Sequence, residues 1–332
     1  MAYTIVPMAS DGSIANPNVL DALAAQAAAV SDIFIFCHGW WTSAAQAQEQ
    51  YTRFTDGVAA CFQRRWDILA IPARNQILPI GVHWPSMVSD HPGVFTNLFE
   101  AFSYDDMRAL AERVARSGLC ALLQRAWRQA TAAHPMRLHV LGHSMGCRIA
   151  CLGLHTAILS DSRPTDPTDL ATAPWSQIQP HVRIDVVLFQ GAIDDDMLEP
   201  IEPYGILSTT PGVRILVTRS DQDKVLKDYP PDDGKHGAMG AAGPTPATFT
   251  DAASRFNGGA GNVVVGAGAT YQVVSAVPQD FVVANLTPLH DAHGNGRNNE
   301  WAGLSGHHSD IYCDEVYELV TGFVYHPMPH PQ

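Results

Sequence analysis

The sequence predicts one α/β domain over residues 1–332, with a mostly parallel sheet covered by helices on both faces. Short apolar runs rich in Val, Ile and Phe alternate with longer Ala-rich segments of helical character, the pattern of strands joined by helical crossovers. Several runs are almost continuously apolar, as expected for strands buried on both faces. Because no repeat or low-complexity linker divides the chain, we expect a single domain that carries insertions.

Seven apolar runs are the predicted strands: residues 3–8, 32–37, 77–84, 137–142, 183–190, 213–219 and 281–286. Five segments between or after them have helical composition and length. These predicted helices are residues 17–29, 43–65, 105–133, 145–160 and 312–324.

Two insertions interrupt this alternation. Residues 85–104, "PSMVSDHPGVFTNLFEAFSY", carry several aromatic side chains between a strand and a helix, and we expect a lid or wall over a pocket. Residues 228–280 are rich in Gly, Pro and Ala. Such a long excursion in a compact domain is functional or mobile, and its valine runs predict a small hairpin.

The charge balance excludes some partner classes. The formal net charge is -13, and only 16% of residues are charged, which argues against nucleic acid or an anionic membrane surface as the main partner. No apolar run approaches the ~20 residues needed for a membrane span, and the N-terminus lacks a signal-peptide pattern. The six cysteines form no CxxC pair. We therefore expect a cytoplasmic protein with free, buried thiols.

The stretch "RLHVLGHSMGCRIAC" contains G-x-S-x-G, with Ser144 at its centre. An apolar strand precedes the motif, and a helix-compatible segment follows it. In this context the serine sits on a sharp turn that exposes its hydroxyl at the edge of the sheet, and the flanking glycines allow close approach of neighbouring chain. The motif therefore predicts that Ser144 is a nucleophile.

The backbone N–H of Met145, at the start of the following helix, is one predicted oxyanion donor. The second is predicted in "IFIFCHGWW", where Gly39 allows a tight turn and Trp40 supplies its N–H. Gly39, Trp41 and His143 are expected to border the substrate. We interpret His38, next to this turn, as a structural hydrogen-bonding residue rather than a second base.

A serine nucleophile needs a base, and an acid to orient that base. In this architecture the acid precedes the histidine in the chain. The segment "SDQDKVL" offers Asp223, with Asp221 as the alternative, and "GHHSDIY" offers His308, with His307 as the alternative. A rival acid exists among the aspartates of "GAIDDDML", which are Asp194, Asp195 and Asp196.

Several segments together resemble the α/β-hydrolase superfamily, in an uncharacterised bacterial branch of serine hydrolases. They are "FIFCHGWW", "VHWPS", "LHVLGHSMGCRI", "VVLFQGAIDDDML", "VTRSDQDKVL" and "GHHSDIY", and they span most of the chain. The resemblance implies a triad of Ser144, Asp223 and a late histidine that hydrolyses carboxylic esters. The doubled His307-His308 and the long 228–280 excursion depart from the family pattern.

The predicted function is therefore that of an esterase or lipase-like hydrolase of small-molecule esters. The histidines lack metal-ligand spacing, so we expect neither metal nor cofactor. The same triad would also serve an amidase, a thioesterase or an acyltransferase. A non-catalytic binding protein on the same fold is the alternative from another class.

Overall fold

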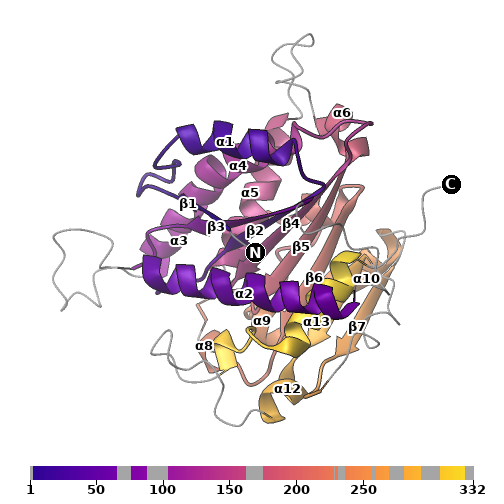
Figure 1. Cartoon of the computed structure of the whole chain (residues 1–332). Coiled ribbons are helices and arrows are strands. Elements are labelled where there is room, and N and C mark those ends of the chain that lie inside the picture. The colour runs from indigo at the N-terminus through magenta and orange to yellow at the C-terminus, as the bar shows by residue number, and fades with distance from the viewer. Residues whose placement is uncertain are drawn as a thin grey trace.

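Parallel strands form one sheet at the centre of the computed structural model (Figure 1). The structure describes residues 3–65, 76–87, 104–161, 175–227, 229–230, 236–255, 259–268, 280–292 and 307–325. Within these residues the sheet has eight strands in the order β1-β3-β2-β4-β5-β6-β8-β7, and every pairing is parallel. The strands are β1 (Thr4–Pro7), β2 (Asp32–Cys37), β3 (Ile77–His83), β4 (Met136–His143), β5 (Val182–Phe189), β6 (Val213–Arg219), β7 (Ala260–Val264) and β8 (Phe281–Asn285).

All seven predicted strands are present. The eighth, β7, lies in the 228–280 excursion, where a hairpin was expected. That expectation is wrong for the first valine run, because β7 pairs with β8 in parallel and extends the central sheet. The second valine run, residues 273–274, lies outside the described residues. So do residues 88–103, which hold most of the predicted lid.

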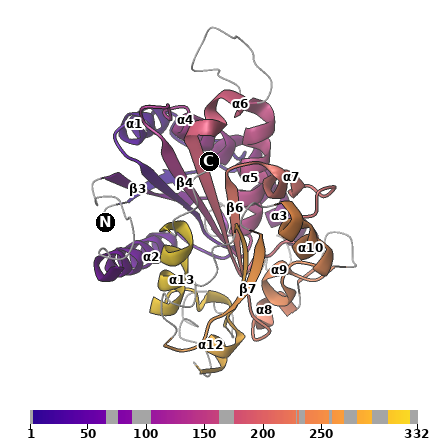
Figure 2. The same cartoon turned by 90° about the vertical axis from the view of Figure 1, so that its right-hand side faces the viewer.

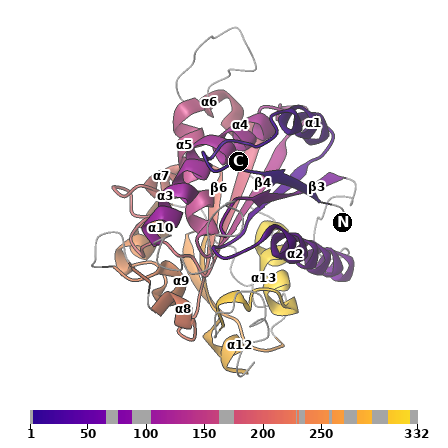
Figure 3. The same ribbon diagram turned by 90° about the vertical axis from the view of Figure 1, so that its left-hand side faces the viewer.

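Helices cover both faces of the sheet, as predicted (Figure 2; Figure 3). One face carries α1 (Asn18–Ala27), α3 (Tyr104–Val114), α4 (Cys120–Trp127), α5 (Gly146–Asp161), α6 (Trp175–Ile178), α7 (Gly205–Thr209) and α10 (Pro246–Arg255). The opposite face carries α2 (Ala44–Arg65) and α13 (Asp314–Tyr325). Three short helices follow strand ends or connect them: α8 (Lys224–Lys227), α9 (Met239–Ala242) and α12 (Thr287–Ala292).

The helix expected over 105–133 is shorter and divided. A π-helical turn, η3 (Ala115–Leu119), separates α3 from α4, and the helical segment ends at Trp127. Gly118 lies at this turn, where an added Cβ would come within 2.8 Å of the Gly12 carbonyl oxygen. The close approach of the Gly12 loop therefore accompanies the change of helical pitch.

The strands supply side chains to two hydrophobic cores, one on each face. Along β2, Ile33 and Ile35 join the core under α5, whereas Phe34 and Phe36 join the core under α2 and α13. This alternation follows from the period of two in a strand. It explains why the predicted strands are apolar almost throughout. All six cysteines are free and buried, as expected.

At β2 the order in which strands are added to the sheet changes side. From β2 it passes to β3 on one side through α2, and the next crossover carries it to β4 on the other side. In open parallel sheets the carboxyl ends of the strands at such a switch point form the crevice that binds ligands. The segments that follow β2 and β4 begin at His38 and Ser144, so the topology places both at this switch point.

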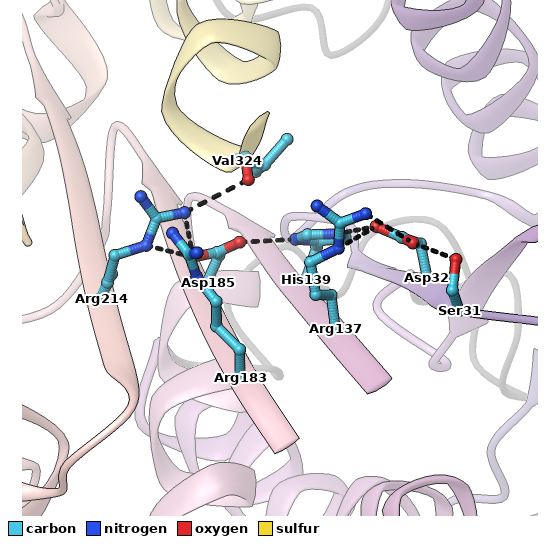
Figure 4. Close-up of polar contacts among 8 residues, drawn as sticks. All are labelled: Ser31, Asp32, Arg137, His139, Arg183, Asp185, Arg214 and Val324. Carbon is cyan, nitrogen blue, oxygen red and sulfur yellow. Dashed lines mark hydrogen bonds and ion pairs between the residues drawn. The ribbon is translucent and has the colours of Figure 1, made fainter. Parts of the chain in front are cut away.

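A row of charged side chains crosses the sheet on its α13 face (Figure 4). His139 on β4 lies at its centre, with Nδ1 2.8 Å from Oδ2 of Asp185 on β5 and Nε2 3.2 Å from Oδ1 of Asp32 on β2. Arg214 on β6 donates from Nε to Asp185 at 2.7 Å. The row also includes Ser31, Arg137, Arg183 and the carbonyl oxygen of Val324 at the end of α13.

The charges in this row stabilise one another despite their burial. Burial alone would raise the pKa of Asp185, but the charge of Arg214 and the hydrogen bond from His139 hold it well below its usual range. Burial would lower the pKa of His139, but its hydrogen bonds to Asp185 and Asp32 raise it above the ordinary value. The row therefore favours a protonated imidazole between two carboxylates.

Candidate active site

Ser144 occupies a strained turn between β4 and α5. Its φ is +55°, a left-handed conformation that is uncommon for a residue with a side chain and costs about 1–3 kcal/mol. Its N–H donates to the carbonyl oxygen of Phe189, and its own carbonyl oxygen accepts from Ala192, at 3.0 and 3.1 Å. The end of β5 therefore holds the turn in place from both sides.

The two glycines of the motif are required by space. A Cβ added at Gly142 would lie 2.6 Å from the backbone of Cys147, and one at Gly146 would lie 2.1 Å from the carbonyl oxygen of Cys37. Gly39 lies against the serine, since a Cβ there would come 3.0 Å from that of Ser144. The serine turn and the loop after β2 therefore pack backbone against backbone.

The loop after β2 is held in place by the segment that follows β3. Ser86, in the "WPS" segment, accepts from the N–H of Trp41 through its carbonyl oxygen and from the N–H of Thr42 through its Oγ. Trp41 has a φ of +61°. Sequence reasoning assigned no role to Ser86, although its segment was part of the family resemblance.

The two predicted oxyanion donors are the backbone N–H groups of Trp40 and Met145. Among the described residues, neither the backbone N–H of Trp40 nor that of Met145 donates a hydrogen bond. Met145 directly follows Ser144, and Trp40 directly follows the glycine that touches the serine. Two unengaged donors beside a serine are the arrangement that stabilises an oxyanion.

His38 has the structural role that was predicted. It is fully buried, its Nδ1 donates to the carbonyl oxygen of Gly39 at 2.8 Å, and its Nε2 accepts from the N–H of Trp84 at 3.3 Å. Burial lowers its pKa to about 3. His38 is therefore neutral and shapes the donor loop.

Asp223 and His308 are paired, as predicted. Nδ1 of His308 lies 2.7 Å from Oδ2 of Asp223, and both side chains are buried. Burial would raise the pKa of Asp223, but the charge and hydrogen bond of His308 hold it below the ordinary value. The backbone N–H of Leu226, in α8, donates to the other carboxylate oxygen at 3.1 Å.

The alternative acids and base have other partners. Asp221 is exposed and accepts from Arg219 at 2.8 Å, and Asp194 accepts from Tyr229 at 2.9 Å. His307 pairs with Asp310 at 2.7 Å. The geometry therefore favours Asp223 and His308 among the candidates that the sequence left open.

His143, expected to border the substrate, lies under the histidine turn η6 (His307–Ser309). Its Nε2 donates to the carbonyl oxygen of His308 at 2.7 Å, and the two imidazole centroids are 4.9 Å apart. Burial lowers the pKa of His143 to about 3, helped by the nearby His308. Since His143 directly precedes Ser144, this bond brings His308 to the serine turn.

Aromatic side chains line up beside the donor loop. Trp40 makes edge-to-face contacts with Trp41 and Tyr104, at centroid distances of 5.7 and 6.3 Å, and Tyr104 contacts Tyr229 at 5.7 Å. Both tryptophans are half-buried. These ring contacts join the segment after β2 to the start of α3 and to the segment after α8.

Among the described residues, one group has the spacing of metal ligands. Asp195, Asp196 and His236 place one ligand atom each within 4.8 Å of one another. The imidazole is divided between the carboxylates, with Nδ1 2.7 Å from Asp195 and Nε2 3.3 Å from Asp196. The two ring nitrogens therefore face different carboxylates, and the three side chains form one cluster of mutual polar contacts. Two of the alternative acids, Asp195 and Asp196, thus have His236 as their partner.

The comparisons with known proteins do not assign a family. No family model and no curated protein matches the chain. Among solved structures, an uncharacterised protein from Pseudomonas aeruginosa is similar at 10% sequence identity, over 67% of this chain and 41% of that one. Its TM-score of 0.26 is too low to indicate a common fold. None of the helices in the described part of the chain combines the length and apolarity that a membrane crossing requires.

Proposed function

We propose that this chain is a serine hydrolase of the α/β-hydrolase superfamily that cleaves carboxylic esters of small molecules. The observation that carries the proposal is the buried Asp223–His308 pair, linked through His143 to the strained Ser144 turn. A strained serine at a strand-to-helix turn, followed in the chain by an acid and then a histidine, is the order of this superfamily.

In the proposed reaction Ser144 Oγ attacks the ester carbonyl carbon while Nε2 of His308 takes the hydroxyl proton. Asp223 holds Nδ1–H, so that Nε2 is the ring nitrogen available as base. The N–H groups of Met145 and Trp40 stabilise the negative charge on the tetrahedral oxygen. His308 then protonates the leaving alcohol, and an acyl-enzyme remains on Ser144.

Water completes the cycle. His308 accepts a proton from a water molecule, which attacks the acyl carbonyl and releases the acid. Proton transfer to Ser144 Oγ then restores the enzyme. Every step uses side chains and backbone groups of this chain, so the proposal requires no cofactor.

A chain-length panel of p-nitrophenyl esters, assayed with wild type and Ser144→Ala, tests the proposal. We expect ester hydrolysis by wild type and a fall of about 10⁴-fold or more in kcat for Ser144→Ala. Activity confined to short acyl chains would identify an esterase rather than a lipase. Equal rates for both proteins would favour the non-catalytic alternative. Activity only on amides or thioesters would instead identify an amidase or a thioesterase.

A further inference from the structure

Gln190 is a buried polar residue that contacts the proposed triad, and it was not among the residues predicted from the sequence. It directly follows β5, its side chain is fully buried, and its φ of +43° lies in the left-handed region. Its backbone N–H donates to Oγ1 of Thr218 on β6 at 3.0 Å. A non-glycine residue held in this conformation is strained, and such strain concentrates at functional sites.

The side-chain amide of Gln190 joins the acid to the histidine turn. Nε2 donates to Oδ2 of Asp223 at 2.7 Å and to the carbonyl oxygen of His307 at 3.0 Å. An amide nitrogen carries two hydrogens, so both donors are used. The reversed amide would turn Oε1 toward a carboxylate, and the contacts therefore fix its orientation.

His143 provides a second anchor for the same turn. It donates to the carbonyl oxygen of His308, next in the chain to the carbonyl that Gln190 holds. The two anchors extend from the ends of neighbouring strands, β4 and β5. Two consecutive peptide carbonyls beside the proposed base are thus tied directly to the rigid sheet.

We infer that Gln190 is a positioning residue, which orients Asp223 and the turn carrying His308 for proton transfer. The inference rests on the proposed function. Oδ2 of Asp223 accepts from both His308 and Gln190, each at 2.7 Å. The amide therefore fixes the direction in which the carboxylate meets the imidazole, and it shares negative charge that would otherwise act more strongly on His308.

The test measures the rate constant of fluorophosphonate labelling from pH 5 to 9 in wild type, Gln190→Met and Gln190→Glu. Methionine keeps the length of the side chain but removes both donors. The bond to Asp223 is charge-assisted, and the loss of such a bond corresponds to about 10- to 100-fold in rate, so we expect a fall of that size per folded molecule. The midpoint of the pH profile should move upward in Gln190→Met, because Asp223 then acts more strongly on His308. It should move further in Gln190→Glu.

Gln50→Met is the matched control, since Gln50 is also a buried glutamine but lies in α2. We expect its labelling rate to stay within about twofold of wild type. Thermal unfolding gives the folded fraction of each protein. If Gln190→Met does not fold, Gln190→Asn replaces it, because asparagine is one methylene too short to reach both acceptors.

The outcomes separate the inference from the proposed function. Labelling of wild type at Ser144, with an unchanged rate and pH midpoint in the Gln190 variants, overturns the inference alone. So does a loss of rate that disappears once the folded fraction is taken into account. Failure of the folded wild type to label at Ser144 overturns the proposed function, and the inference with it.

Discussion

The carboxylate of Asp223 and the imidazole of His308 meet at 2.7 Å although the residues are 85 positions apart in the chain. Asp223 follows the end of β6, and His308 lies in the turn before α13. The pair is buried, and the pKa of Asp223 lies below its ordinary value. The carboxylate is therefore ionised and accepts a hydrogen bond from a protonated Nδ1 of His308. This tautomer is the one that a serine hydrolase needs.

Replacing the acid should remove most of the ester hydrolysis. Asp223→Asn keeps the size of the side chain but favours the wrong tautomer of His308, and we expect kcat to fall about 10³- to 10⁴-fold. Asp221→Asn is the matched control, because Asp221 is exposed and bonded to Arg219. Steady-state kinetics on a p-nitrophenyl ester measure both variants. A larger loss in Asp221→Asn would contradict the pairing.

The two adjacent histidines should separate in the same assay. His308→Ala removes the proposed base, and we expect a fall in kcat of about 10⁴-fold or more. His307 instead bonds Asp310 and stacks on His290 at 4.9 Å. We therefore expect His307→Ala to lower the free energy of unfolding and to leave activity per folded molecule within about tenfold. Retained activity in His308→Ala would reverse the assignment.

The serine turn should not tolerate a methyl group at its second glycine. In Gly146→Ala the new Cβ would lie 2.1 Å from the Cys37 carbonyl oxygen and 2.7 Å from that of His38. Backbone must shift to relieve this overlap, so we expect a loss of about 2–3 kcal/mol in the free energy of unfolding. In Gly266→Ala nothing lies within 4 Å of the added Cβ, and the change should stay below about 0.5 kcal/mol. Urea unfolding distinguishes the two.

The buried row around His139 should make stability depend on pH in a defined direction. The pKa of His139 is higher in the folded protein than in the unfolded chain. Its contribution is therefore complete below about pH 6.5 and is lost as the pH rises through the folded pKa. Asp32 and Asp185 have lowered pKa values. Their contribution is present above about pH 4 and is lost as the pH falls through their folded pKa values.

Urea unfolding between pH 6 and 9 measures the histidine contribution. We expect the free energy of unfolding of wild type to fall more over this range than that of His139→Gln does. The control is His181→Gln, which changes a half-buried histidine outside the row. A pH dependence of His139→Gln identical to that of wild type would show that His139 does not carry the effect.

Much of the fold follows from local pattern. Six of the seven predicted strands are apolar because side chains on both faces enter a core, and that property is visible in any one run. The edge strand β1 has one fully buried residue, Val6. The strand that was not predicted is β7, whose residues Ala260–Val264 alternate between buried and exposed positions at the edge of the sheet. A short, glycine-flanked edge strand contains too few buried side chains to be distinguished from a loop.

The site was partly predictable for a similar reason. Ser144 stands in a local motif whose spacing follows from backbone packing, and the chain order restricted the acid and the base to a few residues. The contacts that distinguish Asp223 from Asp221 and His308 from His307 are tertiary. Gln190 has no local signal, because its contacts are made by residues 33 and 117 positions away in the chain.

The charged row was predictable in principle. Asp32, His139, Asp185 and Arg214 lie in strands that are mostly apolar, and each lies an even number of residues from side chains of the α13-face core. That parity places all four on one face. Which strands are neighbours is what the sequence could not supply, because the order β2-β4-β5-β6 depends on the crossovers.

The central claim is that Ser144 is an activated nucleophile, and covalent labelling tests it most directly. Native wild-type protein and Ser144→Ala would be treated with a fluorophosphonate, followed by intact mass measurement and peptide mapping. We predict one adduct on wild type, located at Ser144, and none on Ser144→Ala or on urea-unfolded protein. An absence of labelling in the folded wild type, or labelling that persists in Ser144→Ala, would contradict the account.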